Sequence, residues 1–314
     1  MAGEPGALSV SPVVTTSVVG QTGLQFTVTV RDAFGNAITA GEHKNITVSA
    51  SVSGATLVSG TQTRSSNAGV ATFNSLVLSG STSNTITVSF AVTFNRLSDG
   101  QATTVTSSGT LVTLTPGAPS QLVIDSTSQT QLNRSTLSQV AVRMLDSFGN
   151  QTVSQSGSIN AVIGSGSGAT LVGTTSSAFA SGATTPAVIT FSNLALQGTV
   201  GTYRIDFNFS GAGVSSVSHT VTLTPGAATR LSLDTSASGA RAGLIFTQQP
   251  RLSLRDIDNN LVPVNASISA TSVTTLTGTT LSEIVDGYAT FSNLAFESNA
   301  SAKTLSYRVT APAQ

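Results

Sequence analysis

The sequence predicts an all-β protein built from three β-sandwich domains in tandem. Two patterns lead to this prediction: apolar and polar residues alternate over many short segments, and several motifs recur in the same order along the chain. Alternation with a period of two is typical of strands with one buried face. No segment keeps the helical period of about 3.6 residues. A chain of 314 residues has room for two or three domains of about 100–150 residues each.

The repeated motifs divide the chain into three copies. Asp-x-Phe-Gly-Asn begins at Asp32 and Asp146, and a degraded copy, Asp-Ile-Asp-Asn-Asn, begins at Asp256. Each copy continues to a Thr-Phe-x-x-Leu motif, at residues 72–76, 190–194 and 290–294. A Thr-Pro-Gly-Ala motif lies at 115–118 and 224–227, and Pro5-Gly6-Ala7 echoes it. We therefore predict domains over 1–116, 117–225 and 226–314.

The alternating segments are the predicted strands. They are short, rich in Val, Ile and Thr, and separated by Gly- and Asn-containing turns. Such strands at a spacing of roughly 8–12 residues are typical of an immunoglobulin-like sandwich. The clearest examples are residues 24–30, 86–90, 217–223, 252–254 and 304–309.

Each motif has a predicted structural role. Asp-x-Phe-Gly-Asn follows a strand and is expected to be a turn, because the carboxylate can accept backbone N–H groups and Gly and Asn tolerate positive φ. The Phe and Leu of Thr-Phe-x-x-Leu should be core residues. Proline at each Thr-Pro-Gly ends a strand and stiffens a short connection. The domains should therefore form an elongated, semi-rigid array.

The third copy is short at its C-terminal end. After Phe291 it contains one predicted strand, 304–309, which we match to 202–207, and nothing matches 217–223. Hence the third domain is predicted to lack its last strand. Truncation, a naturally shorter sandwich, or a strand supplied by another chain through β-augmentation would each explain the deficit.

Composition and charge exclude several classes of function. The formal net charge is zero and charged residues are 8% of the chain, with no basic run, so nucleic acid is not an expected partner. There is no cysteine, which excludes disulfides and thiolate metal sites. No apolar run reaches the ~20 residues of a membrane span, so no membrane insertion is expected within this segment.

Catalytic residues are not apparent. The two histidines, His43 and His219, are expected in a solvated turn and a half-exposed strand position. Neither belongs to a recognisable nucleophile, metalloprotease or phosphate-binding motif. We therefore expect a protein that is not an enzyme and needs no cofactor.

One candidate ligand site stands out in the third copy. Asp256, Asp258 and Asn260 place several side-chain oxygens within five residues, which is the ligand type that Ca²⁺ prefers. The sequence is not an EF-hand loop, and the same residues can make a plain Asx-type turn. Calcium binding and a metal-free turn both remain open.

The motifs resemble those of a known group. Asp-x-x-Gly-Asn after the second strand, followed by Gly-x-Ala-Thr-Phe at 69–73 and 287–291, resembles the tandem bacterial immunoglobulin-like repeats of invasin/intimin-type adhesins and related filamin-like surface proteins. The resemblance implies three sandwich domains in a secreted or cell-surface protein. In that group the repeats mostly serve as spacers.

The expected function is thus a structural stalk of a bacterial adhesin or extracellular fibre. Two alternatives are a self-assembling filament subunit joined by strand exchange and a module that binds a glycan or receptor. The expected partners are other copies of the chain, neighbouring repeats of a longer chain, or a glycan or protein on a host or cell surface.

Overall fold

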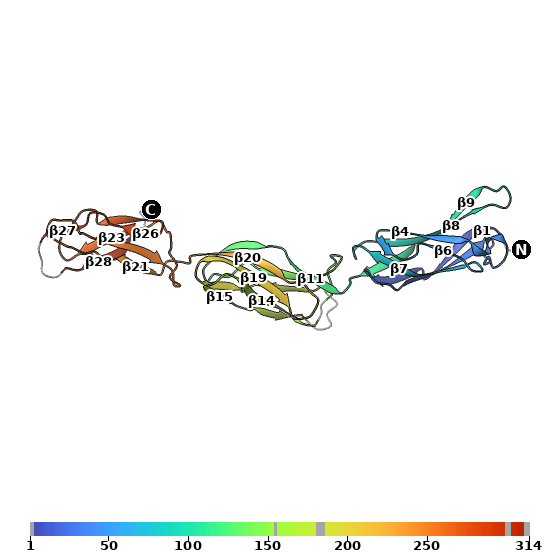
Figure 1. Ribbon diagram of the computed structural model, residues 1–314, viewed down its shortest axis with the longest axis horizontal. Coiled ribbons are helices and arrows are strands. Elements are labelled where there is room, and N and C mark those ends of the chain that lie inside the picture. The colour runs from blue at the N-terminus through green and yellow to red at the C-terminus, as the bar shows by residue number, and fades with distance from the viewer. Residues whose placement is uncertain (1–2, 154–155, 180–185, 299–302, 311–314) are drawn as a thin grey trace.

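The computed structural model describes residues 3–153, 156–179, 186–298 and 303–310. Strands dominate these residues, and their only helical segment is one short 3₁₀ turn, η1 (Glu42–Asn45). Figure 1 shows the strands gathered into three sandwiches laid end to end. We call them the first, second and third unit, and the limits 116/117 and 225/226 between them stay predictions. Each unit has its own hydrophobic cluster, within residues 19–114, 122–223 and 246–296.

The first unit is a sandwich of two sheets. One sheet has the order β1-β3-β7-β5, and the other β2-β10-β8-β4-β6 with β9 paired to β8. Its strands are β1 (Pro5–Ser11), β2 (Val14–Val18), β3 (Leu24–Asp32), β4 (Thr47–Ser53), β5 (Thr56–Ser59), β6 (Thr63–Ser65), β7 (Val70–Ser79), β8 (Ile86–Asn95), β9 (Ala102–Thr106) and β10 (Thr110–Thr115).

The second unit repeats this arrangement without the β9 hairpin. Its sheets are β11-β13-β17 with β15-β18 on one side, and β12-β20-β19-β14-β16 on the other. The strands are β11 (Pro119–Ile124), β12 (Ser128–Leu132), β13 (Val140–Asp146), β14 (Ser158–Ser165), β15 (Ala169–Val172), β16 (Ser176–Ala178), β17 (Val188–Phe191), β18 (Ala195–Gly198), β19 (Gly201–Phe209) and β20 (Val217–Thr224).

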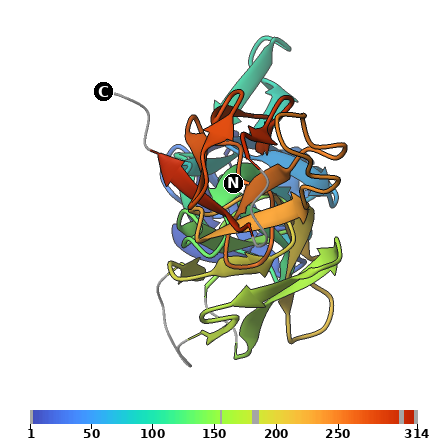
Figure 2. The same ribbon diagram turned by 90° about the vertical axis from the view of Figure 1, so that its left-hand side faces the viewer.

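The third unit has fewer strands among its described residues. Its main sheet runs β21-β22-β26-β25-β23-β28, with a separate β24-β27 pair. The strands are β21 (Arg230–Thr235), β22 (Arg251–Arg255), β23 (Ser267–Ser272), β24 (Leu276–Thr277), β25 (Leu281–Val285), β26 (Tyr288–Thr290), β27 (Ala295–Phe296) and β28 (Leu305–Thr310). In Figure 2, which looks along the chain from this unit, the red terminal strand lies at its side.

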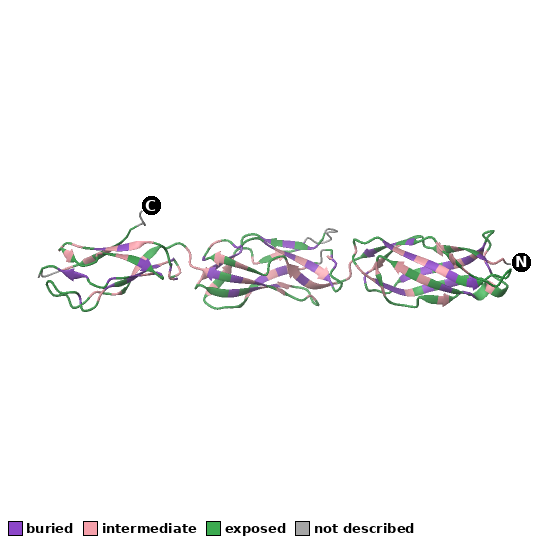
Figure 3. Cartoon of the chain, turned by 90° about the horizontal axis from the view of Figure 1, so that it is seen from above, coloured by how far each residue is buried: buried purple, intermediate pink, exposed green. Residues whose placement is uncertain are grey.

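The cores confirm the roles predicted for the second motif. The Phe and Leu of Thr-Phe-x-x-Leu are buried in all three units: Phe73, Leu76, Phe191, Leu194, Phe291 and Leu294. Each of these phenylalanines packs on an aromatic ring of another strand, Phe90 on β8, Phe207 on β19 and Tyr307 on β28, with centroids 4.9 Å, 5.2 Å and 6.1 Å apart in units one to three. Figure 3 shows buried and exposed residues alternating along the strands, which is the pattern the sequence predicted.

Two alignments made from the sequence are wrong by two or three residues. Gly3, not Gly6, lies against the side chain of Asp32 as Gly117 lies against that of Asp146, and Pro5 pairs with Asp32 as Pro119 pairs with Asp146. In the third unit Tyr307 pairs with Ala270 as Phe207 pairs with Ala161, so Tyr307 matches Phe207 and not residue 205. Both errors arose because short Thr/Val/Gly patterns match at several offsets, whereas the sheet register admits one.

The prediction for His219 was also wrong. The side chain is 1% exposed, and its Nδ1 lies 2.7 Å from the carbonyl oxygen of Ser126. It occupies the inward parity of β20, as Val221 and Leu223 do, and the turn after β11 covers that end of the strand. His43 is half-buried against Phe94.

No helix within the described residues is long and apolar enough to span a membrane.

Candidate functional site: the joints between units

The Asp-x-Phe-Gly-Asn turns lie where consecutive units meet. The turn after β13 faces the end of the first unit, and the turn after β22 faces the end of the second. We call these contacts the first joint and the second joint. The same turn in the first unit follows β3 and begins beside Pro5 of β1, near the N-terminus that Figure 1 marks at one end of the array.

Each turn is built by its aspartate, as the sequence predicted. In the second unit Asp146 Oδ1 accepts the N–H groups of Phe148 at 2.8 Å and Asn150 at 2.9 Å. Gly149 has φ of 83°, a conformation that suits glycine. Asp146 Oδ2 also accepts the N–H of Gly117 at 2.9 Å, which fixes the connection between units onto the turn.

The asparagine that ends the turn reaches across the first joint. Asn150 Oδ1 accepts the N–H of Thr82 at 3.0 Å, and its Nδ2 donates to the carbonyl of Gly80 at 3.1 Å. Both partners are backbone groups of the first unit, and Asn150 itself is buried. One amide side chain thus satisfies a donor and an acceptor of the neighbouring unit at a defined position.

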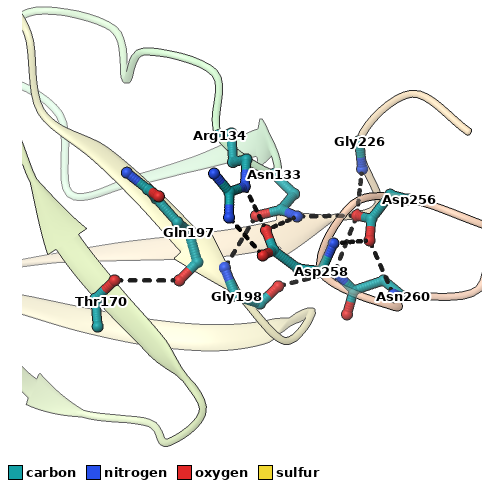
Figure 4. Close-up of polar contacts among 9 residues, drawn as sticks. All are labelled: Asn133, Arg134, Thr170, Gln197, Gly198, Gly226, Asp256, Asp258 and Asn260. Atoms are coloured by element: carbon teal, nitrogen blue, oxygen red, sulfur yellow. Dashed lines mark hydrogen bonds and ion pairs between the residues drawn. The ribbon is translucent and has the colours of Figure 1, made fainter. Parts of the chain in front are cut away.

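The second joint repeats this contact with the equivalent residues. Asn260 Oδ1 accepts the N–H of Val200 at 2.9 Å. Its Nδ2 donates to the carbonyl of Gly198 at 2.8 Å (Figure 4). Asp256 Oδ1 accepts the N–H groups of Asp258 and Asn260, and its Oδ2 accepts that of Gly226 at 3.0 Å. The arrangement of turn, connection and neighbouring unit is therefore the same at both joints.

The second joint also contains a polar cluster. Asn133, which follows β12, donates from Nδ2 to Asp256 at 2.9 Å and to Asp258 at 2.7 Å, and its Oδ1 accepts the N–H of Gly198 at 3.1 Å. Arg134 forms a two-pronged ion pair with Asp258, with Nε–Oδ2 and Nη2–Oδ1 distances of 2.6 Å. Figure 4 shows these side chains converging from the two units.

The electrostatics of the joints favour ionised carboxylates. Burial acts to raise the pKa of Asp256, but hydrogen bonds from Asn260, Asn133 and Gly226 outweigh it and lower the pKa to about 2. The hydrogen bond from Arg134 is the main cause that lowers the pKa of Asp258. These carboxylates therefore stay charged over the ordinary pH range, as acceptors for the N–H groups around them.

The predicted calcium residues thus lie together, but within a set of protein contacts. Asp258 accepts from Arg134 and Asn133, and Asn260 Oδ1 accepts from Val200. Across the described part of the chain, no group of three or more His, Cys, Asp or Glu side chains is arranged to hold a metal. Calcium binding at Asp256, Asp258 and Asn260 stays a prediction, and an ion would have to displace these donors.

The sequence indicated the turns but not the joints. Asn133 and Arg134 went unnoticed because they belong to no repeated motif. A paired change between copies of the repeat could have indicated the ion pair. Arg134 is equivalent to Gly20 of the preceding copy, because the two residues make equivalent backbone bonds, and Asp258 is equivalent to Phe148 in the repeated motif. An arginine and an aspartate that replace two uncharged residues indicate an ion pair.

The fold and the joints together define a chain of β-sandwiches linked end to end. No protein-family model matches the sequence, and no curated protein does either. Among solved structures, the chain is similar to the Escherichia coli adhesin FdeC, with 18% identity and a TM-score of 0.42, over 99% of this chain and 95% of that one.

Two other solved structures give weaker likenesses. Protocadherin gamma B7 extracellular cadherin domains 1–4 match at 8% identity and a TM-score of 0.39, over 97% of this chain and 75% of that one. Domains 1–6 of the surface layer protein SbsC match at 13% identity and a TM-score of 0.26, over 100% and 53%. All are β-rich repeat proteins, and the finer likeness to invasin/intimin-type or filamin-like repeats stays a prediction.

Proposed function

We propose that this chain is a non-catalytic stalk segment of a bacterial cell-surface adhesin or extracellular fibre. The observation that carries the proposal is the repeated joint. Asn150 and Asn260 occupy equivalent positions, and each forms hydrogen bonds with an equivalent pair of backbone groups in the preceding unit. A stalk needs this property, because units fixed end to end hold whatever lies at the tip at a constant distance.

The connections support the same proposal. Only Pro116–Ala118 separate β10 from β11, and Pro225–Thr229 separate β20 from β21. Gly117 and Gly226 are each hydrogen-bonded to the aspartate of the following turn. Short, tethered connections of this kind limit the angles that neighbouring units can reach, in contrast to flexible Gly/Ser-rich linkers.

Small-angle X-ray scattering of the full chain tests this proposal. The expected result is a long, narrow particle whose maximum dimension does not change with concentration. A variant carrying Asn150→Ala and Asn260→Ala should show a broader distribution of interatomic distances, while Asn36→Ala, at the exposed turn of the first unit, should match the parent. A parent profile already as broad as that of the double variant would contradict a fixed stalk.

A further inference from the structure

A cavity lies at the side of the second unit, between its two sheets. It has a volume of about 240 Å³ and lies where the chain crosses from β11, at the edge of one sheet, to β12, at the edge of the other. Its walls come from the turn after β11, from β12, from the start of β13 and the residues before it, and from His219 of β20. All of these residues belong to the continuous described stretches 3–153 and 186–298.

The second unit differs from the first at two buried positions in these walls. Val140 takes the place of Phe26, because each pairs with the phenylalanine of Thr-Phe-x-x-Leu. His219 takes the place of Thr110, because β20 and β10 pair with their neighbours in the same register. All four residues are buried. The smaller Val140 leaves room that a phenylalanine ring fills in the first unit, and the histidine brings a polar ring to that room.

His219 presents an acceptor to the cavity. Its Nδ1 lies 2.7 Å from the carbonyl oxygen of Ser126. A carbonyl oxygen only accepts, so Nδ1 carries a proton and donates it to this bond. In the neutral ring the lone pair is then on Nε2. This atom is buried and has no hydrogen-bond partner among the described residues.

Gln129 presents a donor to the same cavity. Its Oε1 accepts the N–H of Ser138 at 3.1 Å, which fixes the orientation of the amide. Its Nε2 is buried and also has no partner among the described residues. Of the four buried side-chain atoms without a partner in this part of the chain, two therefore belong to residues that line one cavity. Such atoms are costly to leave unpaired, so the cavity is suited to contents that pair with them.

The two nitrogens select a neutral ligand that carries hydroxyl groups. A metal ion or an ammonium group would meet the N–H groups of Gln129, which repel a cation. An anion would meet the lone pair of His219 and the carboxylate of Asp125, and no lysine or arginine is among the described residues that line the cavity. A hydroxyl group can donate to His219 and accept from Gln129, so it satisfies both nitrogens.

The volume defines the size of this ligand. One buried water needs about 10–15 Å³, and sites for drug-sized ligands have about 300–1,000 Å³. The cavity, at about 240 Å³, is much larger than two bridging waters require and smaller than a site for a chain of sugars. Exposed polar residues at its mouth, Ser126, Ser138 and Gln139, offer further hydrogen-bonding groups. A single sugar ring fits these limits.

We propose that this cavity binds one neutral sugar ring, the terminal residue of a glycan. Hydroxyl groups of the ring pair with His219 Nε2 and Gln129 Nε2, and its C–H groups face Val140 and Ala141. The exposed residues at the mouth contact the outer hydroxyl groups, and the rest of the glycan extends into solvent. A ligand site on the side of the second unit goes beyond the stalk function and does not depend on the joints.

The two histidines of the chain make NMR a direct test on the full chain. The probes are the methyl glycosides of glucose, galactose, mannose and N-acetylglucosamine, added while the imidazole signals are recorded. At least one probe should shift the His219 signals saturably, with a Kd of about 1–10 mM, because a small ligand with few contacts binds weakly. The signals of His43, in the first unit, should stay unchanged. His219 signals that no probe moves would overturn the proposal and leave a cavity for water only.

Charged forms of the same ring test the selection by charge. The uronic acid and the amino sugar that correspond to the binding glycoside should each bind at least tenfold more weakly than the glycoside itself. Equal or tighter binding of either charged form would overturn the choice of a neutral ligand. The open-chain hexitol tests the source of the hydroxyl groups. Weaker binding of the hexitol supports the end of a glycan, and binding of the hexitol alone would overturn that assignment.

Three substitutions locate the bound ring. His219→Thr restores the residue of the first unit, Gln129→Met removes the donor, and Val140→Phe fills the cavity. Each should weaken binding at least tenfold, measured by saturation transfer from the protein to the probe, while His43→Gln should bind as the parent does. Thermal unfolding verifies that each variant is folded, and the charged sugars test the site without any substitution. Undiminished binding by Val140→Phe would overturn the assignment to this cavity.

Discussion

The two joints use the same asparagine contact but different side chains beside it. At the first joint Phe148 packs over Gly20, so closely that a Cβ on this glycine would lie 2.3 Å from the ring. At the second joint Arg134 takes the place of Gly20, and Asp258 takes the place of Phe148. An apolar contact in one copy has become an ion pair in the next.

The backbone stays the same through this exchange. Gly20 has φ of 72° and Arg134 has φ of 67°, and the N–H of each donates to the equivalent carbonyl, that of Leu78 or of Leu196. The left-handed conformation costs an arginine more than a glycine. The comparison teaches that the asparagine contact and the backbone define the joint, and that the neighbouring pair of side chains can change chemistry if both members change together.

The largest effect is expected from Asp256→Ala. This change removes a buried carboxylate that accepts five N–H bonds, from Gly226, Asn133, Asp258 and, twice, Asn260. Loss of about 3 kcal/mol of stability is expected, because buried donors are left unpaired. Denaturant unfolding measures the loss, and scattering should show a more flexible second joint.

Asp32→Ala is the matched control for this change. Asp32 makes the same turn bonds to Phe34 and Asn36, but its turn faces no unit within the described chain. Its substitution should cost less and leave the scattering profile unchanged. Equal losses for the two variants, with identical scattering, would mean that these carboxylates stabilise only their own turns.

The next effect concerns Gly20→Ala at the first joint. The added Cβ would collide with Phe148 in a conformation that already favours glycine, so a loss of about 2 kcal/mol is expected. Gly213→Ala is the control, because Gly213 has φ of 78° and an added Cβ there would meet no atom within 4 Å. Thermal unfolding should show the larger loss for Gly20→Ala, and equal losses would reduce the effect to backbone strain alone.

Burial of the repeated phenylalanine shows what the joint contributes. Phe148 is 45% exposed in its joint, whereas the equivalent Phe34 at the N-terminal turn is 90% exposed. The sequence alone predicted the turn at both positions, since an aspartate followed by Gly-Asn encodes it locally. It could not predict the difference, which depends on whether another unit lies against the turn.

The rest of the joint escaped prediction for a physical reason. Asn150 and Asn260 bond to backbone groups 60 to 70 positions away in the chain, and a backbone acceptor or donor leaves no mark on the residue that carries it. The core positions, by contrast, were readable, because burial favours apolar side chains at inward strand positions, and buried His219 is an exception that the sequence did not indicate. Sequence reasoning therefore found the sandwiches and the turns but not how one unit rests on the next.

The next effect is the loss of stability at low pH that we expect from Asp256 at the second joint. The pKa of Asp256 is lowered from 3.8 to about 2, so its ionised form stabilises the folded chain above about pH 4. That contribution is lost as the pH falls from about 4 through about 2, when the folded chain also takes up the proton. Thermal unfolding over this range should show the loss. In the Asp256→Asn variant the melting temperature should fall less over this pH range. A pH dependence equal to that of the parent chain would assign the loss of stability to other carboxylates.

A smaller effect is expected from exchanging the chemistry of the second joint. Arg134→Gly and Asp258→Phe should each destabilise the joint alone, while the double variant, which copies the first joint, should recover part of the loss. The coupling of the wild-type pair should shrink as salt rises from about 0.1 M to about 1 M, where the screening length falls from about 10 Å to about 3 Å. A double-mutant cycle measures it, and strict additivity would show that the two side chains are independent.

Calcium should have the smallest effect on the second joint. Asp256, Asp258 and Asn260 could offer oxygens to the ion, which requires six to eight ligands. Those oxygens already accept protein N–H groups, and Asp258 is neutralised by Arg134. The melting curve should therefore be the same in millimolar calcium and in chelator. If calcium raised the melting temperature and this effect disappeared in Asp258→Asn, the metal site would be favoured instead. An Asp258 carboxylate that serves only as a partner of protein groups would give no stabilisation by calcium.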